Sequence, residues 1–164
     1  MIDLRVDSAA DALQELRGLQ AAHAVTFLPA AYARFGDDAK RKGDLITAER
    51  EYARAETGFR AAVARKPKDP DALNELAWFL AVHDRDLAEA VRVARDAVLA
   101  RPRDPNLYDT LAEAEYRSGS LTRAIEAMER AVKFSGNEAR YVDRLGRWTR
   151  ERAALEGKAG TVRP

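Results

Sequence analysis

The chain has 164 residues, of which 46% are hydrophobic and 34% are charged, and its 28 basic and 27 acidic residues leave a net charge of +1. This balance argues against a general polyanion binder, which needs a large basic excess, and the absence of cysteine excludes disulfides, thiolate metal sites and cysteine nucleophiles. Alanine is the most frequent apolar residue, which favours closely packed helices over strands, so we expect an all-α fold.

The first residues do not have the pattern of a targeting signal. Residues 1–7 carry two acids and no apolar core, which is unlike a signal peptide. Nowhere in the sequence do about 18 apolar residues follow one another, as a membrane-spanning helix requires. We therefore expect a cytoplasmic protein that makes no contact with a membrane.

The first expected helix covers residues 8–28 and forms an N-terminal domain, 1–28, that packs on the rest of the fold. Its larger side chains recur at steps of three and four, the helical spacing; they are Leu13, Leu16, Gln20, His23 and Phe27. Because proline interrupts helices, Pro29 is expected to separate this helix from the next one, over residues 30–42.

The next expected helix, over residues 44–66, is unusually long. An alanine-x3-aromatic-x2-alanine motif occurs twice in it, from Ala48 to Ala55 and from Ala55 to Ala62. This overlap amounts to an insertion of about two helical turns that does not rotate the apolar stripe. We expect the N-terminal helix to cover the added turns.

Five further helices are expected over residues 70–83, 87–101, 105–118, 121–135 and 138–155. Asp69 and Asp104 each precede a proline, the arrangement of an N-cap followed by a first-turn proline, and Asp86 precedes Glu89 as in a capping box. Gly43 and Gly119 stand where a helix end favours a left-handed residue. Residues 156–164 are expected to be a disordered tail.

A repeated motif links these helices. Alanine-valine, separated by three residues from a proline, occurs at Ala24, Ala62 and Ala97, and a fourth copy at Ala131 ends in Gly136 instead. The copies from Ala62 onward are 35 and 34 residues apart, which indicates a structural repeat. In the last copy the other apolar and small positions follow in order: Tyr108, Leu111, Ala112, Gly119, Leu121, Ala124, Met128 and Ala131.

This pattern resembles the tetratricopeptide repeat, a family of paired helices. The resemblance implies a right-handed superhelical stack of antiparallel helix pairs, an α-solenoid, with three repeats at about 29–67, 70–102 and 105–136 and a closing helix at 138–155. Its small residues are expected where helices approach closely. It also implies a scaffold or adaptor that binds a peptide or helix of another protein in the concave groove lined by the first helix of each pair.

The groove residues are predicted on the first helices, off their apolar stripes. They are Asp37, Lys40, Arg41, Asn74, Trp78, Asp109, Glu113, Tyr116, Arg144 and Arg147. Trp78 lies outside the stripe of Leu73, Leu76 and Leu80, so it either anchors a partner or packs beneath the adjacent pair.

The expected charge of the groove indicates the kind of partner. The family's carboxylate clamp uses lysines and asparagines, and of the corresponding residues only Asn74 is suitable. An acidic middle would favour a partner segment with basic residues at its centre. The acids of this middle are Asp71, Asp109 and Glu113, and the bases at its two ends are Arg34, Lys40, Arg41, Arg144, Arg147 and Arg150.

No catalytic, cofactor or metal site is expected. His23 is assigned to the apolar stripe of its helix and His83 to a turn, while Glu113 and Glu115 are assigned to solvated helix faces. The sequence has neither a phosphate-binding loop nor a nucleophile elbow. An enzyme is therefore not expected.

Two alternatives to the scaffold stay open. One is a homo-oligomer formed through the N-terminal helix and the long helix. The other, ranked lower, is nucleic-acid binding through the arginines of the closing helix, for which a solvating end-cap is the simpler interpretation; these are Arg140, Arg144, Arg147 and Arg150.

Overall fold

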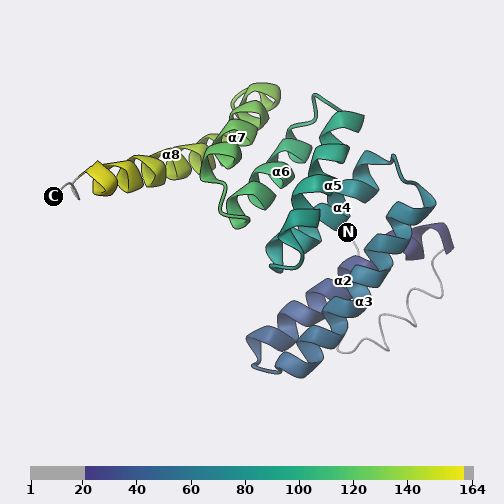
Figure 1. Cartoon of the computed structure of the whole chain (residues 1–164). Coiled ribbons are helices and arrows are strands. Elements are labelled where there is room, and N and C mark those ends of the chain that lie inside the picture. The colour runs from purple at the N-terminus through teal and green to yellow at the C-terminus, as the bar shows by residue number, and fades with distance from the viewer. Residues whose placement is uncertain (1–20, 161–164) are drawn as a thin grey trace. The chain divides into compact units, whose positions relative to one another are not determined.

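The computed structural model describes residues 21–160, with side chains for residues 28–157. In this range the chain forms seven helices and no strand (Figure 1). They are α2 (Ala21–Arg41), α3 (Leu45–Arg65), α4 (Pro70–Val82), α5 (Leu87–Ala100), α6 (Pro105–Arg117), α7 (Leu121–Ser135) and α8 (Ala139–Gly160). Short turns connect them, and α2 packs on α3, α4 on α5 and α6 on α7. The predictions of an all-α fold and of stacked helix pairs are confirmed.

The chain divides into two compact units at the boundary between Lys66 and Pro67. The described part of unit 1 is the pair of helices α2 and α3. Unit 2 contains α4 to α8, in which α6 contacts α4, α5 and α7, and α8 packs against α7. No helix among residues 21–160 is long and apolar enough to cross a membrane.

Unit 1 is a pair of equally long helices. Helices α2 and α3 have 21 residues each, whereas α4 to α7 have 13 to 15. The lengthening predicted for the second helix is therefore matched by its partner, whose additional residues precede Pro29. The predicted helix over residues 8–28 lies outside the described residues as far as residue 20, and residues 21–28 belong to α2.

The predicted break at Pro29 is wrong, because α2 continues through this proline. A proline inside a helix removes one backbone hydrogen bond and costs roughly 3 kcal/mol, so its surroundings must compensate. Pro29 is buried against α3 at a glycine, where a Cβ added to Gly58 would lie 2.5 Å from the proline Cγ. The two helices also approach closely at a second glycine, Gly36 of α2. A Cβ added there would lie 2.5 Å from the ring of Tyr52 on α3. Tertiary packing has overridden the local preference.

Helices α4 to α7 begin at the predicted residues and end at, or one residue before, the predicted ones. Asp69, Asp86 and Asp104 each accept hydrogen bonds at Oδ1 from backbone N–H groups of the first turn, with donor–acceptor distances of 3.0 Å to Asp71, Glu89 and Asn106. Gly119 adopts φ +82° after α6, and Gly136 ends α7 with φ +70°. The predicted caps at Asp69, Asp86 and Asp104 and the predicted turn at Gly119 are confirmed, whereas the cap at Gly136 was not predicted.

The core of unit 2 is built from alanines at the helix contacts and larger side chains between them. Ala90, Ala97, Ala124 and Ala131 are fully buried, as the repeat pattern predicts. The larger buried residues around the last pair include Tyr108, Ile125, Met128, Tyr141 and Trp148. Small residues at these positions let the two helices of a pair approach each other closely.

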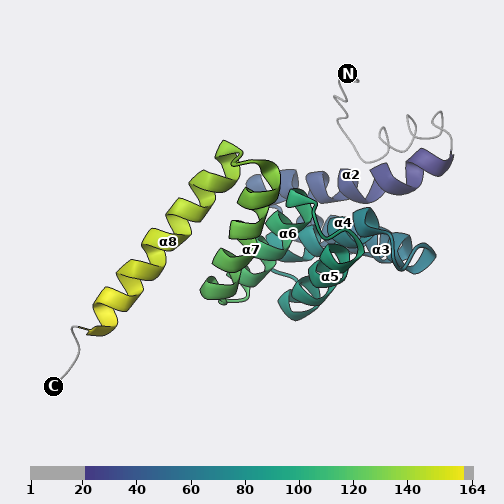
Figure 2. The same ribbon diagram turned by 90° about the horizontal axis from the view of Figure 1, so that it is seen from above.

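Helix α8 is longer than predicted. It extends to Gly160, so the disordered tail predicted from residue 156 is wrong for residues 156–160, while residues 161–164 lie outside the described range. Figure 2 shows the C-terminal half of α8 projecting away from α7. Val142 and Leu155 on this helix are exposed.

Candidate functional site

The predicted groove residues fall in both units. Asp37, Lys40 and Arg41 lie at the C-terminal end of α2 in unit 1. The Asp37 carboxylate accepts a 2.8 Å hydrogen bond from the Tyr52 hydroxyl, and Arg41 pairs with Asp38 at 3.1 Å. The other seven residues lie in unit 2, on α4, α6 and α8.

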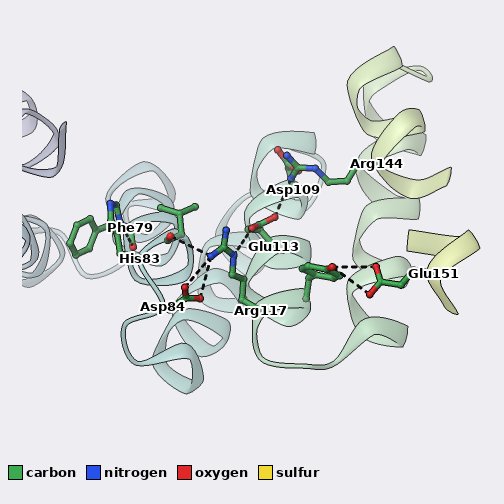
Figure 3. A network of polar contacts seen from close by, with 10 residues as sticks. Phe79, His83, Asp84, Asp109, Glu113, Arg117, Arg144 and Glu151 are labelled. Carbon is green, nitrogen blue, oxygen red and sulfur yellow. Dashed lines mark hydrogen bonds and ion pairs between the residues drawn. The ribbon is translucent and has the colours of Figure 1, made fainter. Parts of the chain in front are cut away.

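In unit 2 the structure brings Asp109, Glu113 and Arg144 together. Nη1 of Arg144 lies 2.6 Å from Oδ1 of Asp109 and 3.6 Å from Oε2 of Glu113 (Figure 3). On its other side, Glu113 accepts a 2.8 Å hydrogen bond from Nε of Arg117. Nη1 of Arg117 lies 3.2 Å from both carboxylate oxygens of Asp84, in the turn after α4. We call this chain, Asp84–Arg117–Glu113–Arg144–Asp109, the polar ladder.

The polar ladder reflects the repeat. Asp109 and Arg144 are 35 residues apart, close to the repeat interval, so they occupy neighbouring positions on successive first helices. The same separation joins Tyr116 of α6 to Glu151 of α8. We call the corresponding side of the first helices of unit 2 the α4–α6–α8 face. It carries Asn74 and Trp78 of α4, Asp109, Glu113 and Tyr116 of α6, and Arg144 and Glu151 of α8.

The side chains of the polar ladder are mostly withdrawn from solvent. The side chains of Asp109 and Glu113 are 16% and 14% exposed, and that of Arg144 is 26% exposed. Burial raises the pKa of the Asp109 carboxyl above its ordinary value, although Arg144 and Arg140 act in the opposite direction. The hydrogen bond to Glu113 is the main cause that raises the pKa of Arg117.

The predicted acidic middle is therefore wrong as a free acidic surface. Asp109 and Glu113 are paired with arginines, and Asp71 pairs with Arg101 at 2.9 Å. The polar ladder, counted with Glu151, contains four carboxylates and two guanidinium groups. It remains acidic, but less so than the sequence alone indicates.

Tyr116 is held against α8. Its ring stacks on Trp148, with centroids 4.8 Å apart and planes inclined by 12°, and its hydroxyl donates to Glu151 at 3.2 Å. Trp148, which is 6% exposed, was not singled out from the sequence. Its spacing of seven residues from the buried Tyr141, with Leu145 between them, is the helical signal that indicates its inward position.

Trp78 occupies the position on α4 that Glu113 occupies on α6. Both helices begin at an aspartate–proline pair, at residues 69–70 and 104–105, and both residues follow their proline by eight positions. Trp78 is 37% exposed, whereas its neighbours Ala77 and Phe79 are buried. The prediction that this tryptophan lies outside the core stripe is confirmed.

Asn74 occupies the position on α4 that Asp109 occupies on α6, one repeat later. Its Oδ1 atom is buried and has no hydrogen-bond partner among the described residues. Trp78 and Asn74 are thus the aromatic and amide counterparts, on α4, of the two carboxylates on α6.

Glu115 is a buried charge that the sequence did not reveal. It is 3% exposed and contacts Arg95 of α5 and Arg123 of α7, the latter at 3.2 Å. The assignment of Glu113 and Glu115 to solvated faces is wrong. Glu113, with a side chain that is 14% exposed, pairs with Arg117 of its own helix and with Arg144 of α8, and Glu115 is buried between Arg95 and Arg123. The arginines lie 20 and 8 residues from Glu115, so no local pattern indicates the pairing.

The arginines of α8 do not form one free basic face. Arg140 pairs with Glu138 at 2.7 Å and donates to Asn106 of α6, and Arg144 belongs to the polar ladder. Arg147 and Arg150 are exposed. Two of the four arginines therefore take part in packing α8 on α6.

His83 has a structural role in unit 2. Its Nδ1 donates to the carbonyl oxygen of Phe79 at 2.9 Å, and the two rings lie 4.6 Å apart (Figure 3). The side chain of His23 lies outside the described residues. Among residues 28–157, no group of histidine and acidic side chains has an arrangement that could hold a metal ion.

No protein-family model and no curated protein matches the sequence. Solved structures do match. The MamA fragment from Desulfovibrio magneticus RS-1, residues 41 to the end, is 23% identical with a TM-score of 0.59, covering 90% of this chain and 85% of that one. The second tetratricopeptide domain of human RPAP3, in complex with the HSP70 peptide SGPTIEEVD, is 17% identical with a TM-score of 0.55, covering 74% and 98%.

An O-GlcNAc transferase from Thermobaculum terrenum also matches, at 19% identity and a TM-score of 0.51. The match covers 74% of this chain but only 22% of the transferase, so the chain corresponds to a small part of that enzyme. The helix pairs, the 34- to 35-residue interval and these similarities lead to one conclusion: this chain has the tetratricopeptide-repeat fold.

Proposed function

We propose that the chain is a protein-interaction scaffold or adaptor that binds a peptide or helix of another protein on the α4–α6–α8 face. The observation that carries the proposal is Trp78, a large aromatic side chain that is 37% exposed on the first helix of its repeat. Partly exposed tryptophans are frequent anchors of protein interfaces. The fold supports the proposal, since the similar RPAP3 domain was solved with a peptide bound.

The charge of the face favours a basic partner segment. The polar ladder, counted with Glu151, has four carboxylates and two guanidinium groups. This excess of negative charge surrounds Glu113, which lies one repeat after Trp78. The RPAP3 domain holds a peptide that ends in EEVD, in which three of the four residues are acidic. Such a peptide would meet repulsion here, so we propose a partner with lysine or arginine next to an apolar residue that contacts Trp78.

The proposal is tested by affinity purification from a lysate of the source organism with the full chain as bait. Trp78→Ala is compared with Leu99→Ala, a change at an exposed apolar residue of α5. We expect Trp78→Ala to lose at least tenfold in the amount of co-purified partner and Leu99→Ala to retain it. Equal recovery with both variants would contradict the proposed face.

The nucleic-acid alternative loses support, because Arg140 and Arg144 are engaged with α6 and its neighbouring carboxylates. The homo-oligomer stays a prediction from the sequence. Light scattering after size exclusion, at several concentrations, distinguishes it from a monomeric scaffold.

A further inference from the structure

Helix α4 has one polar side, which carries Asp71, Asn74, Glu75 and Trp78. Asp71 and Trp78 are each three or four residues from both Asn74 and Glu75, so the four side chains are neighbours on the helix surface. The opposite side of the helix belongs to the core and carries the buried residues Leu73, Leu76, Ala77 and Leu80. A partner that contacts Trp78 therefore comes within reach of the acids of α4.

Most acidic residues of the first helices already have a cation. The two carboxylate oxygens of Asp71 accept hydrogen bonds of 2.9 Å and 3.0 Å from Nη1 and Nη2 of Arg101. Asp109, Glu113 and Glu115 are likewise paired with arginines. Of the five acidic residues on α4 and α6, four are thus engaged with guanidinium groups, which weakens their attraction for a further cation.

Glu75 is the exception. Among the described residues its carboxylate has neither a hydrogen bond nor an ion pair. Burial and the like charge of Asp71 raise the pKa of the Glu75 carboxyl, and no cation of the described residues acts in the opposite direction. The residue is nevertheless exposed, so that a cation from another molecule can reach it.

Trp78 lies where it can contact the same cation. It follows Glu75 by three residues, a spacing that places the two Cβ atoms about 5–6 Å apart on the surface of a helix. The indole is 37% exposed. Lysine and arginine pack their aliphatic stems on apolar surface and are attracted to the face of an aromatic ring within about 6 Å of its centre. One basic side chain can therefore contact the carboxylate and the ring together.

We propose that Glu75 and Trp78 together bind a lysine or arginine side chain of the partner protein. The ammonium or guanidinium group lies on the Glu75 carboxylate, and the aliphatic stem lies on the indole. This inference rests on the proposed function, because it assigns the basic residue of the partner to one carboxylate. Glu75 is then the residue that determines specificity, whereas the paired carboxylates of the polar ladder contribute only to the surrounding negative field.

A display library of short random peptides, selected on the immobilised full chain, tests the assignment. From the wild type we expect peptides that carry lysine or arginine close to an apolar residue. Glu75→Lys should select acidic peptides instead. Glu129→Lys, the same change of charge at an exposed residue of α7, should select the wild-type set.

The outcomes separate this inference from the proposed function. If Glu75→Lys selects the same basic peptides as the wild type and Trp78→Ala loses them, the role of Glu75 is overturned and the proposed face stands. If the wild type selects no peptides, or Trp78→Ala selects the same ones, the proposed function is itself contradicted.

A thermodynamic cycle with the most enriched peptide measures the contact directly. Glu75→Gln removes the charge of the side chain with little change in its size. In the peptide, norleucine in place of lysine, or citrulline in place of arginine, removes the other charge. We expect Glu75→Gln to weaken binding of the basic peptide by about tenfold or more and to leave binding of the neutral peptide unchanged. Equal weakening for both peptides would overturn the proposed contact.

Discussion

Units 1 and 2 use the same helix pair but stabilise it differently. In unit 1 the two helices are fixed by close contacts at glycines, Gly58 against Pro29 and Gly36 against Tyr52. In unit 2, side chains about one repeat apart join successive pairs, as Asp109 and Arg144 do. The comparison teaches that the long pair is stabilised where a side chain of one helix packs directly on a glycine of the other. The short pairs are stabilised also by side-chain contacts between successive repeats.

The largest expected effect comes from the contact between α6 and α8. Trp148→Ala removes a ring that is 6% exposed and stacked on Tyr116, so we expect a loss of about 3–5 kcal/mol in the free energy of unfolding. Chemical denaturation measures it. Leu155→Ala, also on α8 but 54% exposed, is the matched control and should change stability by less than about 0.5 kcal/mol. Similar losses for both would show that Trp148 does not hold α8.

The next effect tests the close contact in unit 1. Gly58→Ala places a Cβ 2.5 Å from Pro29 Cγ, so overpacking should cost about 1–3 kcal/mol. Gly157→Ala on α8 meets no atom within 4 Å and should stabilise the helix by about 0.5–1 kcal/mol. The double variant Pro29→Ala with Gly58→Ala should recover much of the loss, because the clash needs both partners. Simple additivity in this cycle would refute the contact.

A smaller effect is expected at Glu115. Glu115→Gln keeps the side chain's size but weakens its bonds to Arg95 and Arg123, for a loss of about 1–2 kcal/mol. The loss is limited because both arginines are about half exposed and can be hydrated. Glu126→Gln, at an exposed position of α7, is the control. Thermal unfolding that is unchanged in both variants would mean that the buried carboxylate contributes nothing.

The smallest effects are differences in pH dependence between two aspartates of unit 2. The hydrogen bond to Arg101 lowers the pKa of Asp71, so its contribution to stability is present above pH 3.8 and is lost as the pH falls. Burial raises the pKa of Asp109, so its contribution is present below pH 3.8 and is lost as the pH rises. Asp71→Asn should therefore be most harmful at neutral pH, and Asp109→Asn at acidic pH. Urea denaturation at both pH values checks the two signs, and equal signs would contradict the assignment.

The sequence predicted what is local or periodic. Asp69 and Asp104 cap helices through bonds within one turn, and Ala124 and Ala131 are buried where the repeat places them. Pro29 was misjudged because its accommodation depends on Gly58, far along the chain. Such a contact has no local signature.

The candidate site was predicted in part. Trp78, Asp109, Glu113 and Arg144 were selected as candidates, but the pairing of the carboxylates with arginines was not foreseen. The signal was present, since Asp109 and Arg144 are separated by one repeat interval. Glu115 has no such signal, because its arginines come from helices at irregular separations.

The central functional claim is that a partner protein contacts Trp78. A photo-crosslinking amino acid placed at position 78 of the full chain, in living cells, tests this contact directly. The same amino acid at Leu99 is the control, since that residue is exposed on α5. We predict a covalent adduct with another protein from position 78 and none from position 99. The same adducts from both positions, or no adduct from position 78, would contradict the claim.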